Sequence, residues 1–371
     1  MNNKNPYSPK GLLKKEKLYN LWIQKNIEKY FFAILNIDNF RYINDNFGHS
    51  VGDKFLINYG EKLVKIIGDM GLVYKFNGDE FILLLEKSKL KSVDSIIKKI
   101  HKELNEIFYI DGYEIIMTSS IGIYEPHAGE SIENSIRKAF IALYQAKEKG
   151  CNQYACYTQE TEEEIKRKSL LIIELRKNLQ NKNFKEFYIV YQPIYSIEKN
   201  QIEEVEALIR WENPLLGSIP PSEFIPVAEE TGIIRELGYW LIDEVIKHIK
   251  QWQKEGINLR VAINLSPKQV EEKEFLNKIK NILKKEKIEY KKVKFEITET
   301  QILSLNKENQ KILEEFIKLG TDIAIDDFGE GYSSIKNIVF FPINAIKIDK
   351  SLVGFVHKDT KIQLLISSFI S

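Results

Sequence analysis

The stretch Asp322-Ile-Ala-Ile-Asp-Asp-Phe-Gly-Glu-Gly331 decides how the carboxyl-terminal half of this sequence is interpreted. Its apolar run is typical of a short buried strand, and the adjacent Asp326 and Asp327 end that strand. Two neighbouring carboxylates repel each other, and burying them without a compensating positive charge is costly. A hard divalent cation removes this cost, because Mg²⁺ prefers carboxylate oxygens. A solvated turn rich in Asp and Gly explains the same residues equally well, so the other predicted strands must decide between the two interpretations.

Four further strand-like runs carry polar side chains suited to metal binding or catalysis. Helix-patterned segments lie between the runs, so strand and helix alternate as in a parallel β/α barrel. In such barrels polar groups from the carboxyl ends of several strands converge on one face. The sequence therefore predicts one oxygen-rich metal site with a lysine beside it. Its members are Glu206, Asn264, Glu296, Asp326, Asp327 and Lys347.

Length and composition restrict the class of protein. The 371 residues are enough for about two domains, and 29% charged with 43% hydrophobic residues is ordinary for a globular protein. A formal charge of +1 gives no reason to expect binding to a nucleic acid polymer. No apolar run reaches the ~18 residues of a membrane span. Only Cys151 and Cys156 are present, which argues against a disulfide framework and favours a cytoplasmic location.

The amino-terminal half reads as an α+β sandwich with one sheet. Helical patterns cover residues 12–30, 93–107 and 132–149, and strand patterns cover 31–38 and 115–123. Asn77-Gly78 lies between two apolar runs and predicts a type I′ hairpin turn, with Asp79 and Glu80 at its tip.

Residues 5–157 resemble the GGDEF domain of diguanylate cyclases, which condense two GTP into cyclic di-GMP at a two-metal site. The pieces that match are Asn36-Ile-Asp38, Asn44-Asp45, Gly52-Asp53, the hairpin tip, Ser120-Ile-Gly122 and Ala146-Lys147. The resemblance implies a GTP site at Asn44, Asp53, Asp79, Glu80 and Lys147, with Asn44 and Asp53 reading guanine.

Departures from that family predict a degenerate domain. The first metal-binding aspartate falls on Asn36, which brings no charge, and the first glycine of the signature is Asn77. Lys75 and Cys151 replace basic residues of the family pattern. We therefore expect GTP binding or protein contacts without cyclase activity. A purely structural relic is the alternative.

A charged segment, 158–183, predicts an amphipathic linker helix. Residues 184–371 resemble the EAL domain of cyclic di-GMP phosphodiesterases, a TIM-like β/α barrel. The matching motifs are Glu206-Ala-Leu-Ile-Arg210-Trp, Asn264-Leu-Ser266, Glu296-Ile-Thr-Glu299, Asp326-Asp-Phe-Gly329 and Lys347-Ile-Asp349.

This second resemblance implies a role for each predicted site residue and two Mg²⁺ or Mn²⁺ ions. Glu206, Asn264, Glu296 and Asp326 would hold one metal, and Asp326 would share the second with Asp327. Lys347 would help to position or activate the attacking water. Gln192 and Arg210 would contact the dinucleotide, and Glu299 would hold the loop from Asp326 to Ser334.

Six barrel strands are predicted, whereas a complete barrel needs eight. They are 188–194, 205–211, 261–266, 294–299, 322–327 and 345–349. We therefore expect a barrel truncated at its carboxyl end and a chain that is marginally stable, self-associating or weakly active. A homodimer through the EAL-like domain is a further expectation.

The leading hypothesis is a cytoplasmic, metal-dependent phosphodiesterase that opens cyclic di-GMP to linear pGpG, with the GGDEF-like domain as a GTP-binding regulatory module. The alternative is a non-catalytic receptor for cyclic di-GMP or GTP that acts through protein contacts. The intact ligand set favours hydrolysis, and the missing barrel end favours binding alone.

Overall fold

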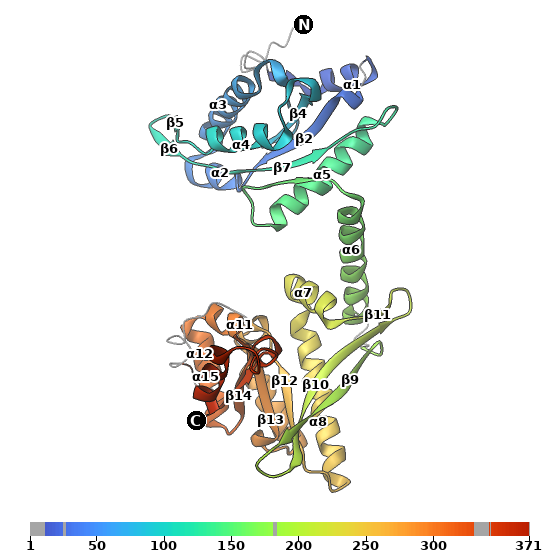
Figure 1. Cartoon of the computed structure of the whole chain (residues 1–371), viewed down its shortest axis with the longest axis vertical. Helices are drawn as coiled ribbons and strands as arrows, with labels where there is room; N and C mark the ends of the chain where they lie inside the picture. Colours follow the sequence, from blue (N-terminus) through green and yellow to red (C-terminus); the bar gives the residue numbers. More distant parts are fainter. Residues whose placement is uncertain (1–11, 25–26, 181–183, 330–340, 342, 371) are drawn as a thin grey trace. The chain divides into compact units, whose positions relative to one another are not determined.

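The computed structural model describes residues 12–24, 27–180, 184–329, 341 and 343–370 (Figure 1). The chain forms two compact units, Met1–Arg167 and Lys168–Ser371. Helix α6 (Gln159–Gln180) covers most of the predicted linker and crosses the boundary between the units. The predicted boundaries at 157/158 and 183/184 stay predictions.

The described part of the first unit is built on a six-stranded sheet. In spatial order its strands are β1 (Leu12–Lys14), β3 (Gly71–Lys75), β4 (Glu80–Glu86), β2 (Tyr30–Ile37), β7 (Ser119–Tyr124) and β8 (Tyr154–Cys156). A separate hairpin pairs β5 (Phe108–Ile110) with β6 (Tyr113–Ile115).

Helices cover both faces of this sheet (Figure 1). They are α1 (Lys15–Gln24), α2 (Arg41–Phe47), α3 (His49–Ile67), α4 (Val93–Leu104) and α5 (Ile132–Glu148). Strand β2 explains the layering, because its successive side chains point to opposite faces. Phe32 and Ile34 pack in the cluster of α1 and α5, whereas Ala33 and Leu35 pack in the cluster of α3 and α4.

Two predictions for the first unit are wrong in detail. Leu12–Lys14 is not helical but forms β1, which pairs in parallel with β3. The hairpin between β3 and β4 exists, but Phe76 N–H bonds to Glu80 O across a three-residue loop, and Gly78 is its glycine at positive φ. A type I′ turn has only two central residues, so Asp79 lies in the loop and Glu80 begins β4.

The described part of the second unit is built on a seven-stranded sheet. Its strands are β9 (Phe187–Ser196), β10 (Gln201–Asn213), β11 (Gly217–Ile219), β12 (Arg260–Asn264), β13 (Val293–Thr298), β14 (Asp322–Phe328) and β15 (Ala345–Ile348). From β10 through β12, β13 and β14 to β15 every neighbouring pair is parallel. The carboxyl ends of these five strands therefore lie at one edge.

Helices pack on the outer face of this sheet. Those that contribute buried residues to its core are α7 (Pro221–Thr231), α8 (Ile234–Lys254), α9 (Pro267–Val270), α10 (Phe275–Glu286), α11 (Glu299–Ser304) and α12 (Lys307–Lys318). After β15 the chain continues through α14 (Lys350–Val353) and α15 (Thr360–Ile370). The alternation in β10 shows why: Val205, Ala207 and Trp211 are buried in the core, whereas Glu206 lies on the opposite, inner face.

The predicted alternation of parallel strands and helices does not hold for the first two strands of this unit. Strands β9 and β10 are antiparallel, and β11 adds a short antiparallel pairing at the end of β10. The four residues between β9 and β10 are too few for a parallel crossover, which needs a dozen or more. In the described residues the sheet does not close, because β9 pairs only with β10 and β15 only with β14. A barrel truncated after about six strands stays a prediction.

Candidate metal and catalytic site

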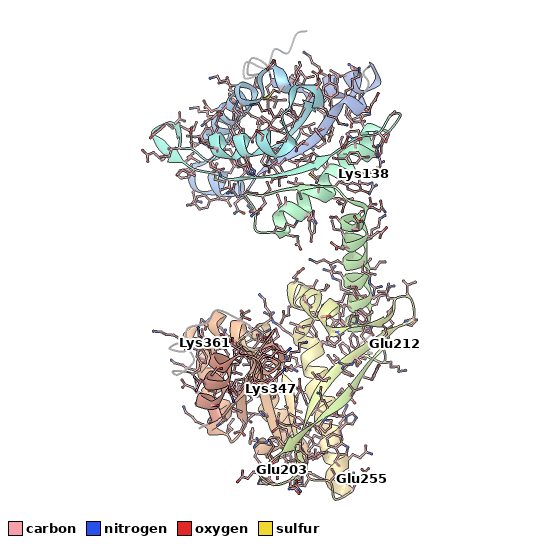
Figure 2. The ribbon with its side chains drawn as sticks, viewed as in Figure 1. Lys138, Glu203, Glu212, Glu255, Lys347 and Lys361 are labelled. Carbon is pink, nitrogen blue, oxygen red and sulfur yellow. The ribbon has the colours of Figure 1, made fainter. Side chains whose placement is uncertain are left out.

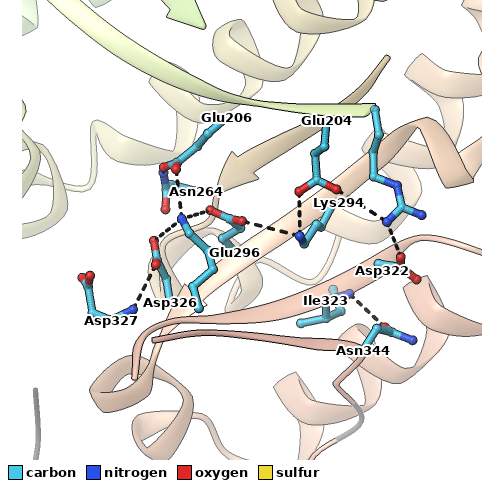
Figure 3. Close-up of polar contacts among 12 residues, drawn as sticks. Glu204, Glu206, Asn264, Lys294, Glu296, Asp322, Ile323, Asp326, Asp327 and Asn344 are labelled. Atoms are coloured by element: carbon cyan, nitrogen blue, oxygen red, sulfur yellow. Dashed lines mark hydrogen bonds and ion pairs between the residues drawn. The ribbon is translucent and has the colours of Figure 1, made fainter. Parts of the chain in front are cut away.

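Three acidic side chains from three strands converge on the inner face of the second sheet (Figure 3). Glu206 comes from β10, Glu296 from β13 and Asp326 from the end of β14. One carboxylate oxygen of each lies within 4.8 Å of the others. The register explains this arrangement, because Asn264 lies opposite Glu296 and Thr298 lies opposite Asp326 in the parallel ladder.

Lys347 of β15 lies in the middle of these carboxylates; Figure 2 labels it within the second unit. Its Nζ donates to Glu296 Oε2 at 2.6 Å, to Glu206 Oε2 at 2.9 Å and to Asp326 Oδ2 at 2.9 Å. Burial by itself lowers the pKa of Lys347, but the three carboxylates outweigh it and raise that pKa above its ordinary value. The lysine is therefore charged when the site holds no other cation.

Glu296 is the most deeply buried member of the site. The residue is 1% exposed, and burial raises the pKa of its carboxyl to about 7, although the bond from Lys347 acts in the opposite direction. Its Oε1 is buried and has no hydrogen-bond partner. Lys294 Nζ lies 3.9 Å from this oxygen, which is too far for a hydrogen bond, so the oxygen keeps the capacity to bind a further ligand. Together with the convergent carboxylates it makes the site fit a hard divalent cation.

Asn264 and Asp327 stand at the margin of the cluster. Asn264 ends β12, is exposed, and its Nδ2 donates to Glu206 Oε1 at 2.8 Å. Asp327 has a positive φ of 52°, and its N–H donates to Asp326 Oδ1 at 2.9 Å. Among the described residues, the three-carboxylate cluster does not include Asp327. The positive φ turns the chain sharply after Asp326.

A cavity of about 540 Å³ adjoins this cluster. Arg210, Asn264, Glu296 and Asp327 are among its lining residues, together with apolar residues of α7 and α8. Arg210 Nη1 donates to the carbonyl of Ile209 at 2.8 Å. Gln192 is exposed on β9 directly opposite Glu206, but it is not part of the cavity lining.

Glu299 connects the first turn of α11 to the end of β14. It is 4% exposed, and its Oε2 accepts the N–H of Gly329 at 2.8 Å. The remainder of the predicted loop, from residue 330 to Ser334, lies outside the described residues. Its support by Glu299 therefore stays a prediction.

Sequence reasoning missed a second charged layer nearer the amino ends of the strands (Figure 3). Lys294 is 8% exposed; its Nζ lies 2.6 Å from Glu204 Oε1 and 3.9 Å from Glu296 Oε1. Arg260 Nη1 pairs with Asp322 Oδ2 at 2.6 Å. The sequence did contain a signal for this layer. Residues two apart on a strand share a face, so the predicted position of Glu296 on the inner face also placed Lys294 there.

The predicted nucleotide site of the first unit has a different charge pattern. Asn36 of β2 is 6% exposed, and its Oδ1 accepts from Lys147 Nζ of α5 at 2.6 Å. Glu80 lies opposite Asn36 in the sheet, and burial raises the pKa of its carboxyl. Burial also lowers the pKa of the nearby Lys75 to about 8. Asn36 therefore brings no negative charge to this position, and its oxygen already accepts from an ammonium.

The remaining predicted nucleotide contacts are Asn44 on α2, Asp53 on α3 and Asp79 in the hairpin loop. A Cβ on Gly52 would lie 2.1 Å from Asn44 Oδ1, so this glycine allows the Asn44 amide to lie against α3. Asp53 is exposed beside it.

Comparison with known families agrees with this division. The EAL domain model matches residues 173–371, more than half of the chain, and the model for the diguanylate cyclase GGDEF domain matches residues 13–153. The chain therefore belongs to the EAL domain family and carries GGDEF and EAL domains in tandem.

Two curated relatives and one solved structure illustrate the relationship. The cyclic di-GMP phosphodiesterase PdeR of Escherichia coli (strain K12) is 33% identical over 91% of this chain and 50% of its own length. The bifunctional diguanylate cyclase/cyclic di-GMP phosphodiesterase MucR of Pseudomonas aeruginosa is 29% identical over 92% and 50%. The chain thus spans about half the length of these relatives.

The solved structure is the EAL domain of Xanthomonas citri FimX in complex with cyclic di-GMP. It superposes with a TM-score of 0.50 at 19% identity and covers 56% of this chain and 80% of the FimX chain. At this identity the likeness shows the TIM-like barrel fold alone. Among the described helices, none is both long and apolar enough to cross a membrane.

Proposed function

We propose that this chain is a divalent-metal-dependent phosphodiesterase that opens cyclic di-GMP to linear pGpG. The observation that carries the proposal is the convergence of Glu206, Glu296 and Asp326 within 4.8 Å beside a cavity. Membership of the EAL family and the phosphodiesterase name of the PdeR relative support the same substrate. Packing alone does not explain three carboxylates on the inner face of one sheet, because buried charges need partners.

The residues around the cluster would divide the work of phosphodiester hydrolysis. Glu206, Asn264, Glu296 and Asp326 would hold one cation, and Asp326 with Asp327 a second. Bound Mg²⁺ or Mn²⁺ would supply a hydroxide near neutral pH and neutralise charge on the phosphate oxygens. The Lys347 ammonium would add positive charge beside the phosphate and orient the attacking water.

We assign the substrate contacts to residues on β9 and β10 of the second unit. Arg210 lines the cavity, and its planar guanidinium suits bidentate contact with a phosphate. Gln192, which faces the same side of the sheet as Glu206, would contact the dinucleotide through its amide. Glu299 would keep the end of β14, and with it Asp326, in position through its bond to Gly329.

The first unit is proposed to bind GTP without making cyclic di-GMP. The neutral side chain of Asn36 favours this role, because it leaves the metal position one negative charge short, and its Oδ1 already accepts from Lys147 Nζ. Asn44 and Asp53 would read guanine, and Asp79, Glu80 and Lys147 would lie near the phosphates. GTP binding would then act as regulation of the other unit. A non-catalytic receptor for cyclic di-GMP is the second candidate, favoured by the unclosed sheet of the described residues.

Chromatography of nucleotides after incubation with cyclic di-GMP and Mn²⁺ tests the proposal. We expect linear pGpG from the purified chain and none from Glu206→Ala with unchanged melting temperature. Tight binding of cyclic di-GMP without product would contradict hydrolysis and favour the receptor. Cytoplasmic location and a homodimer through the carboxyl-terminal unit stay predictions, which fractionation and sedimentation can test.

A further inference from the structure

Lys347 makes the same contacts that a bound cation would need. Its Nζ lies 2.6–2.9 Å from one oxygen each of Glu206, Glu296 and Asp326. Oxygens of these same three residues form the cluster suited to a metal. A Mg²⁺ ion binds its oxygens at about 2.0–2.1 Å, so an ion held by the same three oxygens that Lys347 contacts would occupy nearly the position of the ammonium nitrogen.

Two positive centres cannot occupy that position together. The carboxylates nevertheless need a positive partner, because the Glu296 side chain is fully buried and that of Asp326 is 15% exposed. Lys347 supplies it here: its side chain is only 29% exposed. Any cation that binds these oxygens must therefore first displace the ammonium.

We propose that Lys347 is a built-in counter-ion that competes with the first divalent cation for Glu206, Glu296 and Asp326. The lysine keeps the acidic cluster compact when no metal is bound, and metal binding releases its ammonium. The proposal rests on the proposed function, since it assigns the metal to this site. It adds that one residue both weakens metal binding and serves the reaction, so the metal concentration controls where Lys347 lies.

Lysine removal should separate these two effects. In Lys347→Met the hydrophobic stem remains and the competitor is gone. We expect the Kd for Mn²⁺, measured by calorimetry without substrate, to fall at least about tenfold, because charge-assisted hydrogen bonds no longer oppose the metal. The melting temperature should drop in the metal-free state and rise more on adding Mn²⁺ than in the wild type. Turnover of cyclic di-GMP should fall.

Lys294→Met is the matched control. Lys294 is also a buried lysine near Glu296, with its Nζ 3.9 Å away, but its hydrogen bond goes to Glu204. This variant removes the same charge without removing the competitor, so its Kd for Mn²⁺ should change much less. An equal gain in both variants would overturn the proposal and assign the effect to general electrostatics.

Lys347→Gln covers the case in which the methionine variant does not fold without metal, because an amide can still donate to one carboxylate. Unchanged or weaker Mn²⁺ binding by a folded Lys347→Gln or Lys347→Met protein contradicts the competition. If unchanged or weaker Mn²⁺ binding by the variants accompanies normal hydrolysis by the wild type, only the competition is contradicted and the proposed reaction stands. Tighter metal binding in the variants with no hydrolysis by the wild type removes the proposed reaction and leaves the competition standing.

Discussion

The two units each bring a lysine ammonium to an oxygen on a central strand, but the neighbours of that oxygen differ. Lys347 meets three carboxylates on the second sheet, whereas Lys147 meets the neutral amide of Asn36 on the first. The single ammonium of Lys347 leaves the three-carboxylate cluster of the second unit with a net negative charge. The Asn36 amide of the first unit is neutral, so Lys147 satisfies its oxygen without a further cation. We therefore propose that the charge of the oxygen ligands, more than the presence of a lysine, decides whether each of these sites recruits a metal.

The largest expected effect comes from removing the carboxylate assigned to both metals. Asp326→Ala should lower the turnover of cyclic di-GMP at least about 10³-fold, because neither cation keeps its full ligand set. The measurement is the initial rate of pGpG formation at saturating Mn²⁺. Asp322→Ala on the same strand, which removes a carboxylate paired with Arg260 at the other end, should retain turnover if it folds.

The second-largest expected effect is the creation of a metal site in the first unit. Asn36→Asp restores the negative charge that the amide lacks, and we expect it to create a Mn²⁺ site there. The variant is best made in the Asp326→Ala background, so that binding at the second unit does not contribute. Calorimetry should detect bound Mn²⁺ in the double variant but not in Asp326→Ala alone. No gain would mean that the charge of Asn36 is not what separates the units.

A smaller effect concerns the pH dependence of metal binding. The pKa of Glu296 is raised to about 7, so in the metal-free state the carboxyl binds a proton as the pH falls below that value. A metal binds the deprotonated form and must then release the proton. The affinity for Mn²⁺ should rise with pH up to about 7 and level off above it. Calorimetry in buffers of different ionisation enthalpy would detect this proton release, and equal heats below this pH would contradict it.

The smallest expected effect concerns a buried carboxylate that is stabilised by hydrogen-bond donors of the protein, in contrast to the carboxylates of the proposed metal site. Glu162 of α6 is 5% exposed and accepts bonds from Arg137, Lys166 and Tyr157, which lower its pKa to about 2. Its ordinary pKa is about 4.3, so its stabilisation is present above that pH and is lost as the pH falls toward about 2.

The glutamine variant tests this. Glu162→Gln should lower the free energy of unfolding by about 1–3 kcal/mol at neutral pH, and the difference should shrink in acid. Chemical denaturation across pH measures it. A difference that stays constant down to low pH would show that the charge of Glu162 is not involved.

The sequence predicted that Glu206, Glu296, Asp326 and Lys347 lie together, because each stands in a family motif on its own strand, and the structure brings these four side chains together. Their roles in metal binding and catalysis stay predictions. The sequence did not predict β1, which lies in a segment with a helical pattern. It did not predict the antiparallel pairing of β9 with β10, although the short connection between Ser196 and Gln201 contained that information. The contact of Lys147 with Asn36 joins residues 111 positions apart, and that of Lys347 with Glu206 joins residues 141 apart. Contacts between residues so far apart in the sequence depend on sheet register and side-chain direction, which no local sequence pattern predicts.

Direct titration of the chain with Mn²⁺ tests the contrast between the units most directly. We expect binding to be lost in Asp326→Ala and retained in Asn36→Ala, because the three converging carboxylates lie in the second unit. Binding that persists in a folded Asp326→Ala protein, or disappears in Asn36→Ala, would contradict the assignment of the metal to Glu206, Glu296 and Asp326.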